Sequence, residues 1–184
     1  MAHDDRIILG IDPGTNIMGF GVIGVTGKTP ALKDLGVLDI HKERDVYIKL
    51  KRIFETTLSL IDRFLPDELA IEAPFYGKNV QSMLKLGRAQ GVAISAALYR
   101  EIPVFEYAPR KIKMSITGVG QASKEQVAAM LEQQFGFSDV TKSLDATDGL
   151  AVAACHFYQG VTKQKKSSAK SWEEFIRKNP GRLD

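Results

Sequence analysis

The amino-acid sequence predicts an α/β domain in which helices flank a mixed five-stranded sheet. Short β-branched apolar runs predict strands, and apolar residues three and four apart over 45–65 predict a helix. After that helix, apolar strand-like runs alternate with helical stretches, which is the order expected of a layered α/β fold. The chain has 184 residues, 44% hydrophobic and 26% charged, which suits one globular domain.

The first two predicted strands lie on either side of a tight turn. The apolar run 7–11 ends on Asp12, the turn residues 13–16 follow, and Gly19 opens the next strand. An ionised carboxylate at the end of a buried strand is costly unless its charge is compensated. Two interpretations stay open at this point: an Asx turn in which Asp12 accepts hydrogen bonds from nearby amides of Gly14 or Thr15, or a functional carboxylate.

The remaining elements follow in order. The period of apolar residues, Pro66 as a helix stop, and Ser123 with Gln126 as a capping box set their predicted limits. The predicted elements are a strand at 32–40, a helix at 45–65, a strand at 68–72, a small-residue-rich helix at 80–100, a strand at 102–107, a short helix from Pro109, a helix from 123 to 135 and a helix at 144–158.

The positive charge is unevenly distributed along the chain. Residues 161–184 hold seven basic and three acidic residues, whereas residues 1–160 hold eighteen and nineteen. The sequence therefore predicts one folded domain at 1–160 followed by a flexible basic tail at 161–184, with a docked terminal helix as the alternative. Because the charges of residues 1–160 nearly balance, this region is not expected to bind nucleic acid over its whole surface, and any nucleic-acid-binding surface must be local.

The single cysteine and the N-terminal sequence indicate the compartment. Cys155 excludes an internal disulfide and fits a reducing cytoplasm, where it is expected as a buried structural thiol. No signal peptide and no apolar run long enough to span a bilayer can be recognised. We therefore expect a cytoplasmic protein.

Four carboxylates occupy positions where a site could form. Asp12 and Glu72 each close an apolar strand, and Asp145 and Asp148 stand three apart at the start of an apolar helix. Taken singly, each of the last two is a normal residue for a helical first turn. Four acids gathered at the strand ends could not all stay ionised without cations, and oxygen ligands without His or Cys favour Mg²⁺ or Mn²⁺. Two such ions can promote phosphodiester hydrolysis.

Four segments carry a family resemblance over about residues 6–160. The segments 10–15, 71–79, 84–91 and 145–151 resemble, in order, the characteristic segments of the RuvC family of bacterial Holliday-junction resolvases. The resemblance implies an RNase H-like fold, a homodimer and paired symmetric nicks that leave a 5′-phosphate and a 3′-hydroxyl, in recombination and DNA repair. It also implies two Mg²⁺ per subunit, with Mn²⁺ as a substitute, and the RuvA–RuvB branch-migration helicase complex as partner.

The resemblance also assigns roles to residues. It implies that the four acids are catalytic and bind the metals, with Asp12 bridging the ions, Glu72 completing one site and the last two completing the other. Some family members carry His in place of Asp145. The acids in question are Asp12, Glu72, Asp145 and Asp148.

A local excess of basic residues points to a phosphate-binding face. Residues 78–113 hold seven basic residues against two acidic ones. Phe75 and Tyr76, in a loop directly after Glu72, could stack on an unpaired base at the branch point, or lie tucked under the loop. Ordinary solvated helix charges are the alternative for the basic residues. The candidate DNA-binding residues are Phe75, Tyr76, Lys78, Asn79, Lys85, Arg88, Arg110, Lys111, Lys113 and Lys124.

Two further expectations concern small residues, and one concerns a histidine. Gly14 and Gly19 are expected to leave room for a phosphate backbone beside the metals. The helix 80–100 is expected to form the interface of a two-fold dimer, since its small residues would allow a close approach. His156, in an apolar helix, is expected to pack in the core.

Three alternative functions are considered. The turn 12–15 also resembles the phosphate loop of sugar-kinase and actin-like ATPases, although those pair two such domains and 184 residues leave no room for a second. A non-catalytic junction-binding module would not need four acids that repel phosphates. Another RNase H-like nuclease acting on RNA can be separated only by testing substrates.

Overall fold

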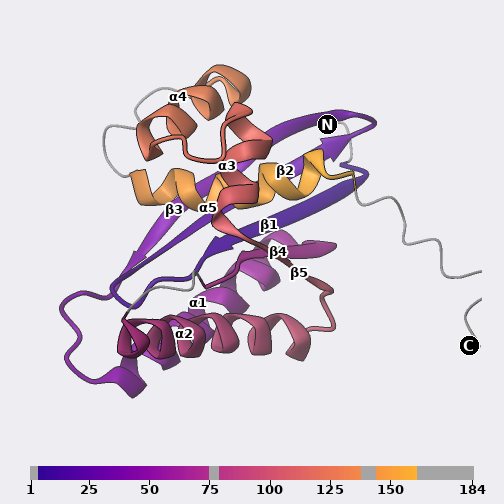
Figure 1. Cartoon of the computed structure of the whole chain (residues 1–184). Helices are drawn as coiled ribbons and strands as arrows, with labels where there is room; N and C mark the ends of the chain where they lie inside the picture. The colour runs from indigo at the N-terminus through magenta and orange to yellow at the C-terminus, as the bar shows by residue number, and fades with distance from the viewer. Residues whose placement is uncertain (1–3, 75–78, 138–143, 161–184) are drawn as a thin grey trace, which may run out of the picture.

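The structure, a computed structural model, describes residues 4–74, 79–137 and 144–160. One five-stranded sheet has the order β3-β2-β1-β4-β5, with β2 antiparallel to β1 and β3, and β4 parallel to β1 and β5. The elements are β1 (Arg6–Asp12), β2 (Ile17–Thr26), β3 (Thr29–Asp39), α1 (Val46–Phe64), β4 (Glu68–Glu72), α2 (Val80–Tyr99), β5 (Val104–Tyr107), α3 (Pro109–Thr117), α4 (Lys124–Phe135) and α5 (Leu144–Tyr158) (Figure 1). The predicted mixed five-stranded α/β fold is confirmed.

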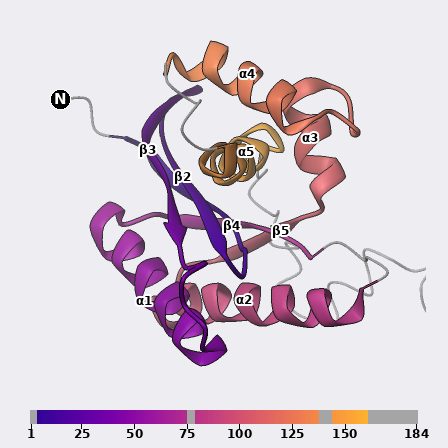
Figure 2. The same ribbon diagram turned by 90° about the vertical axis from the view of Figure 1, so that its left-hand side faces the viewer.

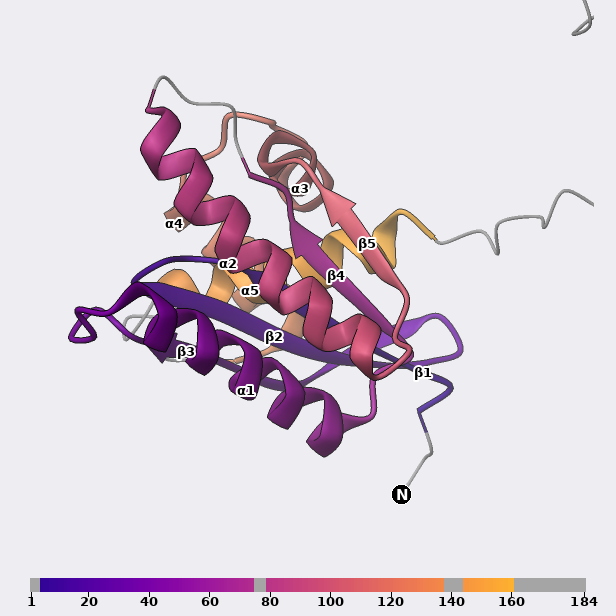
Figure 3. The ribbon, with the colours of Figure 1, turned by 90° about the horizontal axis from the view of Figure 1, so that it is seen from below.

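The helices form two layers on opposite faces of the sheet. Helices α1 and α2 lie side by side on one face, whereas α5, with α3 and α4 beyond it, covers the other (Figures 2 and 3). Each face has its own apolar core, one built around Ile8 and Leu150 and the other around Leu9 and Ile53. Strands β1 and β4 are therefore buried on both faces, which explains their continuous apolar sequences.

Strand alternation decides which way the strand-end acids face. In β1, Ile8 packs in the α5 core, whereas Leu9 and Ile11 pack in the α1–α2 core. Because side chains alternate along a strand, Asp12 faces the same side as Ile8, which is the α5 side. In β4, Ala70 packs on the α5 side and Ile71 on the other, which gives Glu72 the same orientation. Since Ile11 pairs with Ile71 in a parallel register, both carboxylates leave the sheet beside each other.

Glycines let α5 lie with its backbone directly on the sheet. A Cβ at Gly10 would come closer than 3.0 Å to Gly149 and Ala153 of α5. A Cβ at Gly19 would likewise overlap the carbonyl oxygen of Asp145. The helix that carries two of the four acids is thus held against β1 and β2 at a separation that side chains would prevent.

Most of the predicted element limits are confirmed within a few residues. Asp45 caps α1 through the amides of Tyr47 and Ile48, and Ser123 forms the predicted capping box with Gln126. Helix α1 ends at Phe64, and its C-cap Leu65, directly before Pro66, has a left-handed backbone with φ 48°. Strand β3 begins earlier than predicted because its N-terminal part pairs with β2 as far as Thr26, an interaction that local alternation does not reveal.

His156 is buried, as predicted for a packing residue. Its Nδ1 lies 2.7 Å from the hydroxyl oxygen of Tyr107, and its Nε2 lies 3.0 Å from a carboxylate oxygen of Glu68. Arg6 forms an ion pair with the same Glu68 carboxylate. Burial lowers the pKa of His156, so the imidazole is neutral and serves as a hydrogen-bonding link between α5 and the sheet.

Cys155 is also buried, as predicted for a structural thiol. Across the part of the chain that the structure covers, no helix is long and apolar enough to cross a membrane.

Candidate active site

The predicted acids meet at one end of the sheet. Asp12, Glu72 and Asp148 line a single cavity of about 300 Å³ together with Lys113 and Lys124. Its apolar wall comes from α3, α4 and α5, through Ile112, Val127 and Ala151 among others. Strands β1 and β4 supply two acids and α5 supplies the third, so residues distant in sequence are brought to one place.

Asp145 joins the same group through a lysine. The Nζ atom of Lys124 lies 2.5 Å from a carboxylate oxygen of Asp148 and 3.2 Å from one of Asp145. The two acids therefore share a face of α5, as their spacing predicts. We refer to Asp12, Glu72, Asp145 and Asp148 as the carboxylate cluster.

Charge in the carboxylate cluster is incompletely compensated. Burial, together with repulsion from Asp148, raises the pKa of Asp12 to about 6. Burial and repulsion from Asp12 raise the pKa of Glu72 to about 8. The pKa of Asp148 is also raised, mainly by burial, although its contact with Lys124 opposes the shift. The ammonium groups of Lys124 and Lys113 do not neutralise the cluster, and this is the electrostatic condition in which added cations bind well.

These shifts predict a pH dependence of stability for the metal-free protein. A carboxyl group whose pKa is higher in the folded state stabilises the fold below its unfolded pKa, and that contribution is lost as pH rises through the folded pKa. With EDTA present, the melting temperature should therefore fall between about pH 4 and pH 8, the range set by Asp12 and Glu72. Glu72→Gln should flatten this slope, and differential scanning calorimetry of both proteins across that range is the measurement. A slope of equal size in Glu72→Gln would contradict the assignment to this residue.

The residues present fit a hard divalent cation. All the cluster donors are carboxylate oxygens, the donor type that Mg²⁺ and Mn²⁺ prefer. Within the ranges that the structure describes, however, no three His, Cys, Asp or Glu side chains converge closely enough to ligate one ion as they stand. The ammonium of Lys124 lies between two of the acids, so a cation bound there requires Lys124 to move.

Two interpretations of the first turn are corrected. No hydrogen bond joins the Asp12 carboxylate to the amide of Gly14 or Thr15 among the bonds of the described chain, so the Asx turn is not observed. The expectation that Gly14 and Gly19 leave room for a phosphate backbone is wrong. The space beside Gly14 is filled by the carbonyl of Ile17, and that beside Gly19 by the backbone of Asp145.

The candidate DNA-binding residues fall into separate groups. Phe75, Tyr76 and Lys78 lie outside the described residues. The side-chain oxygen of Asn79 accepts a hydrogen bond from the backbone amide of Ser82 at 3.1 Å. This contact caps α2 and gives Asn79 a structural role. Lys113 and Lys124 line the carboxylate cavity, and Lys113 donates to the carbonyl of Ala122 at 2.8 Å.

The remaining basic residues do not form one face. Lys85 and Arg88 belong to α2 on one side of the sheet, whereas Arg110 and Lys111 belong to α3 on the other (Figure 2). Strand β5 lies between these helices in sequence, and the crossover places them on opposite faces. Because β4 and β5 are parallel, both helices begin at the sheet end where Asp12 and Glu72 lie, and they flank the cluster from two sides.

Gln90 makes a contact near the carboxylate cluster that sequence reasoning missed. Its side-chain amide nitrogen lies 2.7 Å from a carboxylate oxygen of Glu106 and 3.3 Å from the carbonyl of Glu72. It is buried, and it ties α2 to the end of β4 that carries a cluster acid. The signal available in the sequence was a glutamine within the small-residue stretch of that helix, because an amide that becomes buried requires hydrogen-bond partners.

Comparisons with known proteins identify the family. Residues 8–156 match the family model described as crossover junction endodeoxyribonuclease RuvC. A RuvC of Christiangramia forsetii is 58% identical over 97% of this chain and 93% of its own length, and one of Porphyromonas gingivalis is 54% identical over the whole of both chains. The second comparison also covers residues 161–184, so the similarity to this relative extends beyond residues 6–160.

A solved structure gives the same result. A structure titled T. thermophilus RuvC in complex with Holliday junction substrate has 29% sequence identity and a TM-score of 0.77, covering 84% of this chain and 94% of that one. A second T. thermophilus RuvC structure is 31% identical with a TM-score of 0.73. The yeast mitochondrial resolvase Ydc2, at 11% identity and a TM-score of 0.59, shares the fold. The chain belongs to the RuvC family of crossover junction endodeoxyribonucleases.

Proposed function

We propose that the protein resolves Holliday junctions by hydrolysing phosphodiester bonds at the carboxylate cluster. The observation that carries this proposal is that Asp12, Glu72 and Asp148 share one cavity with Lys113 and Lys124. Carboxylates can hold cations, and lysines can contact the phosphates on either side of the cut. Family membership supports the substrate, and it argues against the sugar-kinase and actin-like alternative.

The metal requirement follows from the family and from the chemistry of the cluster. RuvC-family enzymes are divalent-metal-dependent nucleases, and we propose two Mg²⁺ per subunit, replaceable by Mn²⁺, held by Asp12, Glu72, Asp145 and Asp148. When bound, the ions activate the attacking water and stabilise the leaving oxygen. The raised pKa values of Asp12 and Glu72 support this, because both acids gain a compensating charge when a cation enters.

The protein's own side chains then position the strand. Lys113 is held by the carbonyl of Ala122, so its ammonium is fixed at the cavity wall for a phosphate oxygen. Lys124 pairs with the two α5 acids, and a cation held by those acids would compete with its ammonium, which could then contact a neighbouring phosphate. Both lysines would lower the charge repulsion between the acids and the DNA.

Two opposed nicks require two active sites, which we propose a homodimer supplies. The outer surface of α2 exposes Val80, Leu84 and Leu98 at 63%, 53% and 59% of their area. Gly87 and Gly91 have open space where a Cβ would lie, whereas the alanines of α2, Ala89, Ala93, Ala96 and Ala97, are buried in the domain's own core. The proposed interface therefore uses the outer glycine and leucine side of the helix, and not its alanines.

Leu84→Glu should dissociate this dimer. A buried unpaired carboxylate in an apolar interface is strongly unfavourable, so sedimentation equilibrium at micromolar concentration should show dimer for the wild type and monomer for the variant. Met130→Glu, at an exposed residue of α4, is the control and should remain dimeric. A wild-type protein that is monomeric at micromolar concentration would overturn the proposal.

Further features of the function are proposed on the family resemblance. The products carry a 5′-phosphate and a 3′-hydroxyl, and the RuvA–RuvB branch-migration helicase complex delivers the junction. We also propose a cytoplasmic location, which the buried free thiol of Cys155 supports.

Cleavage of a synthetic four-way junction tests the proposed function. With Mg²⁺, the wild type should produce symmetric nicks in opposed strands, and end-labelled products on denaturing gels should show both cuts. Parallel reactions with linear duplex DNA and with an RNA–DNA hybrid test substrate choice. Equal cutting of linear duplex would remove the junction assignment, and preferential cutting of the hybrid would favour the RNA-directed alternative.

A further inference from the structure

A second cavity lies next to the carboxylate cluster, on the other face of the sheet. It measures about 250 Å³ and is lined by the turn between β1 and β2, by α1 and by α2. Its cationic residues are Arg44, Lys49, Lys85 and Arg88, and none of its lining residues is acidic. Two of these lysine and arginine residues, Lys85 and Arg88, were expected to contact DNA, whereas Arg44 and Lys49 come from a region that sequence reasoning assigned no function. We refer to it as the basic cavity.

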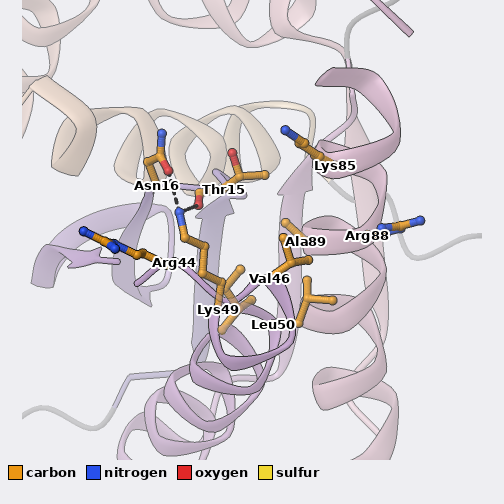
Figure 4. A pocket seen from close by; sticks show the side chains of 10 residues that line it. Thr15, Asn16, Arg44, Val46, Lys49, Leu50, Lys85, Arg88 and Ala89 are labelled. Atoms are coloured by element: carbon orange, nitrogen blue, oxygen red, sulfur yellow. Dashed lines mark hydrogen bonds between the residues drawn. The ribbon is translucent and has the colours of Figure 1, made fainter. Parts of the chain in front are cut away.

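The basic cavity has an apolar floor and a cationic rim. Val46, Leu50 and Ala89 form the floor between the two helices, and Arg44, Lys85 and Arg88 are exposed around it (Figure 4). In that view Arg44 and Arg88 lie on opposite sides of the cavity and Lys85 lies near its upper edge. Neither an ion pair nor a hydrogen bond joins these three side chains to another residue in the described ranges. Their charges are thus available to a ligand.

Lys49 connects the basic cavity to the turn between β1 and β2. Its Nζ donates to the carbonyl oxygen of Thr15 at 3.0 Å and to the side-chain oxygen of Asn16 at 2.7 Å (Figure 4). Thr15 and Asn16 follow Asp12 by only three and four residues. One short turn therefore carries a cluster acid at its start and forms a wall of the basic cavity at its end.

The fold places both cavities at the same end of the sheet. Helix α2 starts just beyond the end of β4 that carries Glu72. Helix α1 starts just beyond the end of β3 at Asp39, and Asp39 pairs with Ile17, the first residue after the turn between β1 and β2. The carboxylate cavity opens on the α5 side and the basic cavity on the α1–α2 side. A chain of phosphates that passes over the sheet end would meet the acids first and the four cations next.

We propose that the basic cavity binds a backbone phosphate of the junction, on the strand that continues past the cut. The charge of the lining residues suits an anion, and a DNA strand offers phosphates at a regular short spacing. The inference rests on the proposed function, because it takes the cut strand to lie at the carboxylate cluster. Contact at Lys49 would also fix the turn that begins at Asp12, so binding there would position this acid for the reaction.

The test compares two charge-matched double variants in the full chain, each with Asp12→Asn to prevent cutting. Arg44→Gln/Lys85→Gln removes two cavity cations that lack partners in the described chain. Lys28→Gln/Lys51→Gln removes two exposed cations elsewhere, one in the β2–β3 turn at the opposite end of the sheet and one on the outer side of α1. The measurement is the dissociation constant for a four-way junction with Mg²⁺ over a series of salt concentrations.

Loss of one phosphate contact has a recognisable signature. The cavity variant should bind about tenfold more weakly at low salt, and the slope of log K against log salt should fall by about 1. The control should keep the parent's slope and affinity within about twofold. Equal losses in both variants, or no loss in either, would overturn the proposal.

A modified substrate locates the phosphate. Replacing single phosphates of the junction by neutral methylphosphonates should reveal one position that weakens the Asp12→Asn parent but has no further effect on Arg44→Gln/Lys85→Gln. If no position behaves in this way, the cavity does not hold a defined phosphate and the proposal fails. A parent that prefers linear duplex would refute the junction function instead, and the salt slopes on duplex would still decide the phosphate site.

Discussion

Asp12→Asn is expected to abolish junction cleavage while junction binding is retained. Asn keeps the size and one oxygen but removes the negative charge at the centre of the cluster, where burial and Asp148 already act on this residue. A loss of about 4 kcal/mol in transition-state stabilisation corresponds to about a thousandfold in rate. Single-turnover cleavage at saturating protein measures the rate, and an electrophoretic shift of the same junction measures the binding.

The matched control is Asp62→Asn. Asp62 lies on the exposed side of α1 and pairs with Arg100 at 2.8 Å, far from the sheet end that carries the cluster. Asp62→Asn removes the same charge as Asp12→Asn and should leave the cleavage rate within about twofold of the wild type, since an isolated exposed ion pair contributes little to stability. Cleavage that persists in Asp12→Asn, or an equal loss in both variants, would contradict the assigned chemistry.

Asp12→Asn also separates function from stability. Because the pKa of Asp12 is raised in the folded state, its ionised form opposes folding near neutral pH when no cation is bound. The variant should therefore be at least as stable as the wild type in EDTA, although it does not cut. A loss of activity with equal or higher melting temperature would show that the residue is kept for its chemistry and not for the fold.

The sequence predicted the cluster because three independent patterns agree on it. Asp12 and Glu72 each close an apolar strand, the three-residue spacing gives Asp145 and Asp148 one side of a helix, and family resemblance links the two pairs. What local patterns could not supply is the contact between the pairs. That contact depends on α5 packing against β1 and β2, which joins residues more than a hundred positions apart.

The basic residues show where sequence reasoning reaches its limit. A count of charges over 78–113 treats α2 and α3 as neighbours, yet the crossover through β5 puts them on opposite sides of the sheet. Conversely, Arg44 and Lys49 are distant from that segment in sequence but share a cavity with Lys85 and Arg88. Charge patterning predicts that a phosphate surface exists, and only the topology decides which residues share it.

Gly19 shows the same limit for a small residue. Its lack of a side chain suggested space for a ligand, but the space is filled by the backbone of α5. A glycine in a strand indicates that some backbone approaches closely, and the sequence does not say whether that backbone belongs to a ligand or to the protein itself.

Gly10→Ala should damage both the fold and the site, because the added methyl group would lie closer than 3.0 Å to Gly149 and Ala153 of α5. Helix α5 would have to move off the sheet, and overpacking of this kind costs about 1–3 kcal/mol. For a domain of this size the melting temperature should fall by up to about 10 °C. The acids of α5 would shift with the helix, and a displacement of about 1 Å can lower a rate about a hundredfold.

Gly91→Ala separates that steric effect from the general cost of replacing a glycine. The position lies within α2, no atom of the described residues lies within 4 Å of the added carbon, and alanine favours helix, so stability should change by less than about 1 kcal/mol. Because Gly91 lies on the proposed dimer face, Gly91→Ala is a control for stability only: thermal unfolding compares both variants, and single-turnover cleavage below the melting transition compares Gly10→Ala with the wild type. Normal stability and cleavage in Gly10→Ala would show that neither the fold nor the site depends on the close packing of α5 against β1. Loss of cleavage at nearly normal stability would show that the glycine contacts serve the placement of Asp145 and Asp148 more than the cohesion of the core.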